Sequence, residues 1–292
     1  MLLPMRQLSK LDILLVLQDI GIIRDKCFCR HCSHIVSLRP AQKMDGYCWR
    51  CDNVSCEKYK TTTSLRAGSF FEKHRFSMVD ILTIVYYWCN KEPVTKTEMY
   101  LNQTRKTTSS VYEHCRLVVS GFLANSPVLL GGPGVVCQID ESAFTHKCKA
   151  HRGRAPEKTV WVFGIVDTSF KPARGYMEIV PDRSKETLLP IIGRICRPGT
   201  EIHSDEWGAY RAIQTSLGFD HKTVNHSACF VNPANGVHTQ NIESYWAKHK
   251  HMLKSMKGIK RGRLPMYLQE CTWRDMVENH AFLNFLKLIE IN

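Results

Sequence analysis

Three acidic residues stand where a folded sheet could bring them together for chemistry on phosphate groups. Asp140 ends the apolar run 135–139, Asp205 follows the segment 201–204, and Glu243 lies within the helix predicted over 239–256. Cleavage and transfer of phosphodiesters by in-line attack use two metal ions that stabilise the attacking and leaving oxygens. Magnesium needs only one or two carboxylates besides phosphates and water, so three convergent acids are enough.

Each of these acids, taken alone, is equally typical of a solvated surface carboxylate or a helix cap. Five other acids stand in similar local contexts: Glu141, Asp167, Asp182, Glu206 and Asp220. Local sequence therefore proposes the three catalytic candidates without separating them from these five.

A second group with metal-binding character is the set of cysteines between positions 27 and 56, in a segment with little aliphatic core. Structural zinc takes four Cys or His ligands, commonly as two closely spaced pairs. Cys29 and Cys32 form one such pair. The second pair is either Cys48 with Cys51, which has the commoner spacing, or Cys51 with Cys56. A segment without a hydrophobic core needs another source of stability, such as a bound metal, so we expect zinc here and not free thiols.

The elements that must position the acids are strands followed by an alternation of helices and strands. We predict strands over 135–140, 160–167, 175–180, 201–204 and 221–224, and helices over 185–196, 209–217 and 239–256. This order predicts an α/β fold, an RNase H-like mixed sheet with flanking helices. On the last helix a core-facing stripe places Glu243 at its border; the stripe is Ile242, Tyr245, Trp246, His249 and Leu253.

The preceding part of the chain divides into three smaller regions. Residues 1–25 predict one helix closed by Gly21, 26–75 a zinc-ribbon-like module, and 76–130 a helical connector, before a catalytic domain over 131–292. The connector holds helices over 77–90, capped by Ser77, and 111–123, joined by a polar Lys/Thr-rich stretch. This pattern is compatible with a helix-turn-helix or with a plain helical linker. The apolar run 11–23 is shorter than the ~20 residues of a membrane span, so no membrane partner is expected.

The charge of the chain favours polyanionic partners. Forty Lys and Arg against 27 Asp and Glu give a formal net charge of +13, and such a field attracts nucleic acid. A basic run follows Glu243 and is placed to neutralise DNA phosphates, the alternative being a solvated helix face; it comprises Lys248, Lys250, Lys254, Lys257, Lys260, Arg261 and Arg263. The segment 147–154 is a second basic candidate of the same kind.

Several ordered motifs resemble a known family. They include Trp49-Arg50-Cys51 with Cys56, the segment 64–71, Ile139-Asp140-Glu141-Ser142, Trp161-Val162-Phe163-Gly164, Ser204-Asp205-Glu206-Trp207 and His238-Thr239-Gln240-Asn241-Ile242-Glu243-Ser244. From about Cys29 to about Leu286 the chain resembles Merlin-type DDE transposases and the related bacterial insertion-sequence transposases.

The resemblance implies an enzyme that excises and integrates a mobile element between short inverted repeats. It implies that Asp140, Asp205 and Glu243 hold Mg²⁺ or Mn²⁺, and its Trp-x-Cys-x4-Cys pattern favours Cys29, Cys32, Cys51 and Cys56 as the Zn²⁺ ligands. The implied partners are double-stranded DNA, as inverted repeats and as target, and at least a second copy of the chain, because two ends must be synapsed. A nuclear location is expected, or the cytoplasm or nucleoid if the source is bacterial.

Neighbouring residues and rival functions remain open at this point. His203 and His238 could orient ligands or contact the scissile phosphate, or could simply be packed, whereas Trp207, Tyr210 and Trp246 are expected in the core and not as base-stacking residues. Rival functions are a host-adopted DNA-binding protein without transposition activity, and a nuclease or resolvase of the same fold that cuts without joining.

Overall fold

The chain forms two compact units, nested in sequence. A computed structural model describes residues 7–144, 159–225, 228, 230–256 and 259–291. Unit 1 comprises Met1–Val118 and Asn279–Asn292, and unit 2 comprises Val119–Glu278. Unit 2 is therefore an insertion between the main part of unit 1 and its last segment.

Unit 2 is built on a five-stranded sheet in the order β6-β5-β4-β7-β8. The strands are β4 (Val136–Ala143), β5 (Trp161–Asp167), β6 (Arg174–Val180), β7 (Glu201–Ser204) and β8 (Asp220–Thr223). The pairs β4–β5 and β5–β6 are antiparallel, whereas β4–β7 and β7–β8 are parallel. This order, with these directions, is that of the RNase H-like fold, which confirms the predicted fold class.

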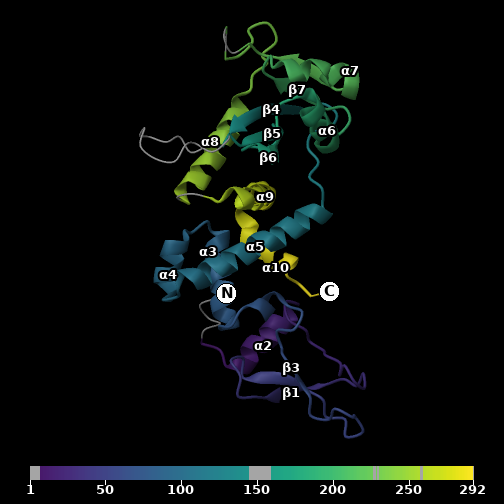
Figure 1. Cartoon of the computed structure of the whole chain (residues 1–292), viewed down its shortest axis with the longest axis vertical. Helices are drawn as coiled ribbons and strands as arrows, with labels where there is room; N and C mark the ends of the chain where they lie inside the picture. The colour runs from purple at the N-terminus through teal and green to yellow at the C-terminus, as the bar shows by residue number, and fades with distance from the viewer. Residues whose placement is uncertain (1–6, 145–158, 226–227, 229, 257–258, 292) are drawn as a thin grey trace. The chain divides into compact units, whose positions relative to one another are not determined.

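Helices cover both faces of this sheet (Figure 1). One face packs against α6 (Lys185–Ile195), η2 (Gly208–Ala212) and α7 (Ile213–Leu217); the other packs against α8 (Gln240–Ser255) and α9 (Leu264–Val277). Side chains of β5 alternate between the two cores: Phe163 and Ile165 join the first, Val162 and Val166 the second. The stripe predicted on α8 is confirmed, since all five of its residues are buried.

Unit 1 combines a small ribbon with short helices. The strands β1 (Ser37–Pro40), β2 (Tyr47–Arg50) and β3 (Thr62–Thr63) form an antiparallel sheet. The helices are α2 (Lys10–Asp19), η1 (Phe70–Lys73), α3 (Met78–Cys89), α4 (Val94–Leu101), the first part of α5 (Arg105–Asn125), and α10 (Ala281–Leu288). Phe285 of α10 is fully buried against Phe70 and Trp88, so the last segment completes this core.

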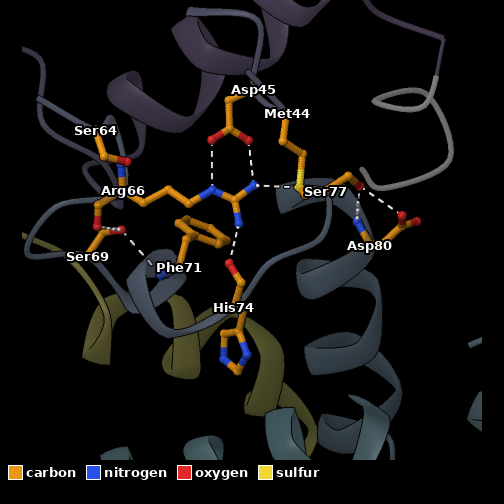
Figure 2. Close-up of polar contacts among 9 residues, drawn as sticks. All are labelled: Met44, Asp45, Ser64, Arg66, Ser69, Phe71, His74, Ser77 and Asp80. Atoms are coloured by element: carbon orange, nitrogen blue, oxygen red, sulfur yellow. Dashed lines mark hydrogen bonds and ion pairs between the residues drawn. The ribbon is translucent and has the colours of Figure 1, made fainter. Parts of the chain in front are cut away.

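A buried arginine ties the ribbon to the segment that leads into α3 (Figure 2). The guanidinium of Arg66 donates to both carboxylate oxygens of Asp45, at 2.7 and 2.5 Å, and to the carbonyl of His74 at 2.7 Å. Both charged side chains are buried, with 8% and 14% of their areas exposed. The bidentate pair and the carbonyl together occupy donors of the guanidinium that burial would otherwise leave unsatisfied.

Several predicted helices differ from those observed. The helix expected over 1–25 is α2, which begins at Lys10 because the Ser9 side chain accepts the N–H of Asp12. The helix expected over 111–123 begins at Arg105 instead, where the hydroxyl of Thr104 accepts the N–H of Thr107. The connection expected between the two helices of 76–130 contains α4.

The helix predicted over 77–90 is confirmed as α3, with Ser77 as its N-cap. The helices α9 and α10 were not predicted. No helix within the described ranges has the length and apolar character needed to cross a bilayer.

Candidate active site and zinc centre

Asp140 and Asp205 lie at the same edge of the sheet. The strands β4 and β7 are parallel neighbours, and Gln138 is the register partner of His203. Two residues further along each chain, Asp140 lies in the second half of β4 and Asp205 directly follows β7. The Oδ1 atom of Asp205 accepts the backbone N–H of Trp207 at 2.9 Å, which orients this carboxylate in its turn.

Gln138 fixes the first turn of α8, which carries Glu243, against β4. Its side-chain oxygen accepts the backbone N–H groups of Asn241 at 2.9 Å and Ile242 at 3.2 Å. Both are among the N-terminal donors that a helix leaves unsatisfied. Gln138 is buried and lies on the same face of β4 as Asp140, two residues later. The strand and the helix are therefore held in a fixed register, and Glu243 comes to the edge that holds the two aspartates.

An indole ring connects the helix to the first acid directly. The Nε1–H of Trp246 donates to Oδ2 of Asp140 at 3.0 Å. The ring packs over Gly164, the register partner of Asp140 on β5. A Cβ atom at position 164 would lie 2.6 Å from the ring, so only glycine leaves room for it. The last residue of the Trp161–Gly164 motif must therefore be glycine, because the Trp246 ring occupies the space of a side chain at position 164.

The electrostatics of the site favour cation binding. Burial, together with the charges of Asp205 and Glu243, raises the pKa of Asp140 to about 6, although the hydrogen bond from Trp246 lowers it. The charges of the other two acids therefore act on Asp140. Divalent ions would relieve this repulsion, and carboxylate oxygens are the ligands that magnesium prefers.

A lysine of α8 reaches the same strand. The ammonium of Lys250 donates to the hydroxyl of Ser142 at 2.6 Å, two residues beyond Asp140, and lies 5.2 Å from the centre of the Phe144 ring. Lys250 and Glu243 are seven residues apart, so they share one face of the helix. Burial lowers the pKa of Lys250. The site therefore holds a cation beside the carboxylates.

Glu141 points to the opposite side of β4 from Asp140. It accepts the hydroxyl hydrogen of Tyr210 at 2.7 Å, and burial raises its pKa to about 7. The sequence did not predict a role for Gln138 or the hydrogen bond from Trp246 to Asp140. For Trp246 a signal was present, because it lies three residues after Glu243 and therefore on the same side of the helix.

The remaining predicted residues are placed as follows. Lys248 binds Asp275 of α9 at 2.5 Å, whereas Lys254, Lys260, Arg261 and Arg263 are exposed. Lys257 and the basic segment 147–154 lie outside the described residues. His203 is packed against Glu201 at 2.5 Å, and His238 lies 3.4 Å from the amide of Gln138.

Of the three aromatic residues expected in the core, two are buried there. Tyr210 and Trp246 are 1% and 5% exposed. The expectation was wrong for Trp207, which is 40% exposed because it follows the end of β7 in a turn at the edge of the sheet.

In the ribbon, the structure brings together Cys29, Cys32, Cys51 and Cys56. Their sulfur atoms all lie within 4.8 Å of one another, and two pairs, Cys29–Cys56 and Cys32–Cys51, are each 3.8 Å apart. A zinc ion with bonds of about 2.3 Å to four sulfurs makes a tetrahedron with edges of about 3.8 Å. The geometry therefore fits zinc.

Protonation differs between the thiols of this group. Backbone N–H groups of His31 and Cys32 lower the pKa of Cys29 to about 6, whereas burial raises the pKa of Cys56 to about 12. Cys48 is buried on β2 and is not part of this group.

Comparisons with known proteins find transposase-like sequences. The sequence pattern of the ISXO2-like transposase domain matches residues 131–275. A transposase-like protein of Haemophilus influenzae, itself uncharacterised, is 32% identical over 99 residues, which are 34% of this chain and 78% of the relative.

Two solved structures show a more distant likeness. One is the simian T-cell lymphotropic virus intasome in complex with a PP2A regulatory subunit (TM-score 0.33, 14% identity, 65% of this chain and 67% of that chain). The other is the catalytic core domain of BIV integrase (TM-score 0.34, 14% identity, 52% and 93%).

Proposed function

The chain belongs to the ISXO2-like transposase family, and we propose that it cleaves DNA at the ends of a mobile element and joins the freed 3′-hydroxyls to target DNA. A DNA-processing function of the transposase type follows from the family. The observation that supports active chemistry is the edge where Asp140 and Asp205 meet the first turn of α8, with Glu243 acting on the pKa of Asp140.

In this proposal Asp140, Asp205 and Glu243 hold two Mg²⁺ ions, with Mn²⁺ as a substitute. Such ions supply Lewis-acid stabilisation of the attacking and leaving oxygens. The chain's own residues position these acids: Trp246 orients the carboxylate of Asp140 through its N–H. Lys250, beside Ser142, is placed to contact a phosphate of the strand being cut.

The ribbon and the assembly complete the proposal. Zn²⁺ is bound by Cys29, Cys32, Cys51 and Cys56. The ribbon that this zinc site stabilises contacts the ends of the element. The exposed basic residues after Glu243 neutralise DNA phosphates. Two ends must be brought together, so at least two copies of the chain act in one complex. We further propose that the chain is of the Merlin type and acts in the nucleus, or in the cytoplasm or nucleoid if the source is bacterial.

The test is an assay of cleavage and strand transfer on oligonucleotides that carry the inverted repeats flanking the gene, with Mg²⁺. Wild type is expected to cut and join. Asp140→Asn, Asp205→Asn and Glu243→Gln should abolish both steps, whereas Glu206→Gln, which changes the exposed acid next to Asp205, should retain them.

Each other outcome has a defined meaning. Undiminished cleavage in the three variants would refute the site assignment. Cleavage without joining by wild type would indicate a nuclease or resolvase, and DNA binding without cleavage would indicate a host-adopted binding protein.

A further inference from the structure

An arginine at the edge of the sheet is held between two indole rings. The guanidinium carbon of Arg183 lies 4.1 Å from the centre of the Trp161 ring and 4.4 Å from that of Trp207. The Nε1–H of Trp207 donates to the carbonyl of Arg183 at 3.0 Å, which fixes the second ring relative to the arginine backbone. The side chain is therefore pre-organised by its neighbours.

Strand directions place this stack at the edge that holds the catalytic acids. Trp161 begins β5 opposite Ala143, the last residue of β4, and opposite Val180, the last residue of β6. Arg183 follows β6 by three residues, and Trp207 follows β7 just after Asp205. The backbone N–H of Trp207 is the group that donates to Asp205, so the stack and the second acid share one turn.

The donors of this arginine are unused within the described part of the chain. No described residue accepts a hydrogen bond from the Arg183 guanidinium, whose charge acts on the nearby carboxyl of Glu141. Arg194 offers a contrast, because it lies over Tyr176 and is also paired with Glu178 at 2.8 Å. The guanidinium carbon lies over both indole rings, and its N–H groups have no described acceptor, so they are available to a ligand.

The ligand that suits such a group is a phosphate. A planar guanidinium with free in-plane donors matches two phosphate oxygens bidentately. Trp207 is 40% exposed and Arg183 is partly exposed, so the stack can be reached from solvent.

We propose that Arg183, clamped between Trp161 and Trp207, binds a backbone phosphate of the DNA that enters the catalytic edge. This inference rests on the proposed function and adds a second phosphate contact, besides Lys250, at the edge that holds the acids. Arg183 is then a substrate-positioning residue, and the two tryptophans hold it in place.

The test measures binding of the full-length protein to a fluorescein-labelled 30-base-pair duplex by anisotropy, over a range of salt concentrations without Mg²⁺. Arg183→Gln is expected to weaken binding about ten-fold, the loss of one charge-assisted contact. It should also reduce the slope of log K against log salt by about 0.9, the value for one phosphate. Arg183→Lys should keep most of the slope, because it keeps the charge.

Arg194→Gln is the matched control, since it removes a stacked arginine of the same unit that already has a carboxylate partner. Affinity and slope equal to wild type in Arg183→Gln, at an unchanged melting temperature, would overturn the inference. An equal loss in Arg194→Gln would also overturn it, because the effect would then be one of net charge.

The two proposals can fail separately. Wild type that binds and cuts DNA while Arg183→Gln binds equally well leaves the proposed function standing and removes only this inference. Wild type that binds through Arg183 but never cuts retains the phosphate contact and removes the proposed catalysis. Wild type that does not bind the duplex removes both.

Discussion

Replacing Asp140 by asparagine is expected to abolish catalysis and, at the same time, to stabilise unit 2 at neutral pH. The pKa of Asp140 rises from 3.8 to about 6 in the folded chain, mainly through burial. Each pKa unit corresponds to about 1.4 kcal/mol, so the ionised carboxylate costs the fold about 3 kcal/mol. Asparagine carries no charge, and its amide oxygen can still accept the N–H of Trp246.

The gain in stability of Asp140→Asn over wild type should increase as pH rises. Since the folded pKa is raised, the folded chain binds the proton more tightly, and this stabilisation is fully present only below about pH 4. It is lost as pH rises to about 6 and stays lost above that value. The advantage of Asp140→Asn is therefore small at pH 4, about half complete at pH 5, and complete at pH 8.

Differential scanning calorimetry in Mg²⁺-free buffer measures this effect. For a unit of this size 1 kcal/mol shifts Tm by about 2–4 °C, so a rise of about 6–12 °C is expected at pH 8 and about half of that at pH 5. Added Mg²⁺ should raise the Tm of wild type and not that of the variant, because only the former binds the ions.

Asp182→Asn provides a control of opposite sign. The Ser184 hydroxyl and backbone N–H, with the Thr187 hydroxyl, lower the pKa of Asp182. The ionised Asp182 carboxylate therefore stabilises the fold above its ordinary pKa, and this stabilisation is lost in acid. Asp182→Asn should be less stable than wild type at pH 8, and the difference in stability should shrink as pH falls. A Tm of Asp140→Asn at or below wild type at pH 8, or an equal gain at pH 5 and pH 8, would refute the reasoning.

The other predictions concern the zinc group, the indole of the active site and the buried arginine. Cys51→Ser should lower the zinc content below about one ion per chain, whereas Cys48→Ser, outside the sulfur group, should retain about one, as measured by mass spectrometry of the metal after dialysis. Trp246→Phe keeps an aromatic ring and removes the N–H that donates to Asp140, so the pKa of Asp140 should rise. The rate of DNA cleavage should therefore fall about ten-fold at pH 7 and partly recover at pH 9. A pH–rate profile identical to that of wild type would contradict this. Arg66→Ala strands a buried carboxylate and should reduce the free energy of unfolding of unit 1 by about 3–5 kcal/mol in urea titrations, whereas the half-exposed Arg39 should contribute about 1 kcal/mol or less.

The catalytic sheet was predictable because its strands are buried on both faces. The run 160–167 is apolar almost throughout, and its residues alternate between two cores, so the sequence signal matches the burial. The segment 201–204 was predicted with the bounds of β7, in which three of the four residues are buried. The order of strands and helices then left few topologies to consider.

The helical ends were less predictable because single side chains set them. Threonine and serine disfavour helix interiors, so the sequence pointed to a start at Val111, whereas the helix begins at Arg105, where Thr104 caps it. The helix α4 has a polar sequence and one buried residue, Thr97, so its pattern carries little periodic signal.

Within the site, local patterns identified the elements that carry the acids but not the contacts among them. The bond from Trp246 to Asp140 and the capping of α8 by Gln138 each join residues about 100 positions apart. Such contacts depend on the packed geometry of the sheet and not on sequence spacing. The exposure of Trp207 likewise depends on where β7 ends at the edge.

The nesting of the two units has a consequence for the order in which the chain can fold during synthesis. During synthesis the N-terminal part of a chain emerges first, so N-terminal domains generally fold first. Here the aromatic core of unit 1 needs Phe285, which the ribosome adds only after all of unit 2 has been made. The catalytic unit can therefore close before the unit that begins the chain. A premature stop near residue 279 would leave the acids in place and deprive the unit that carries the four cysteines of its final helix.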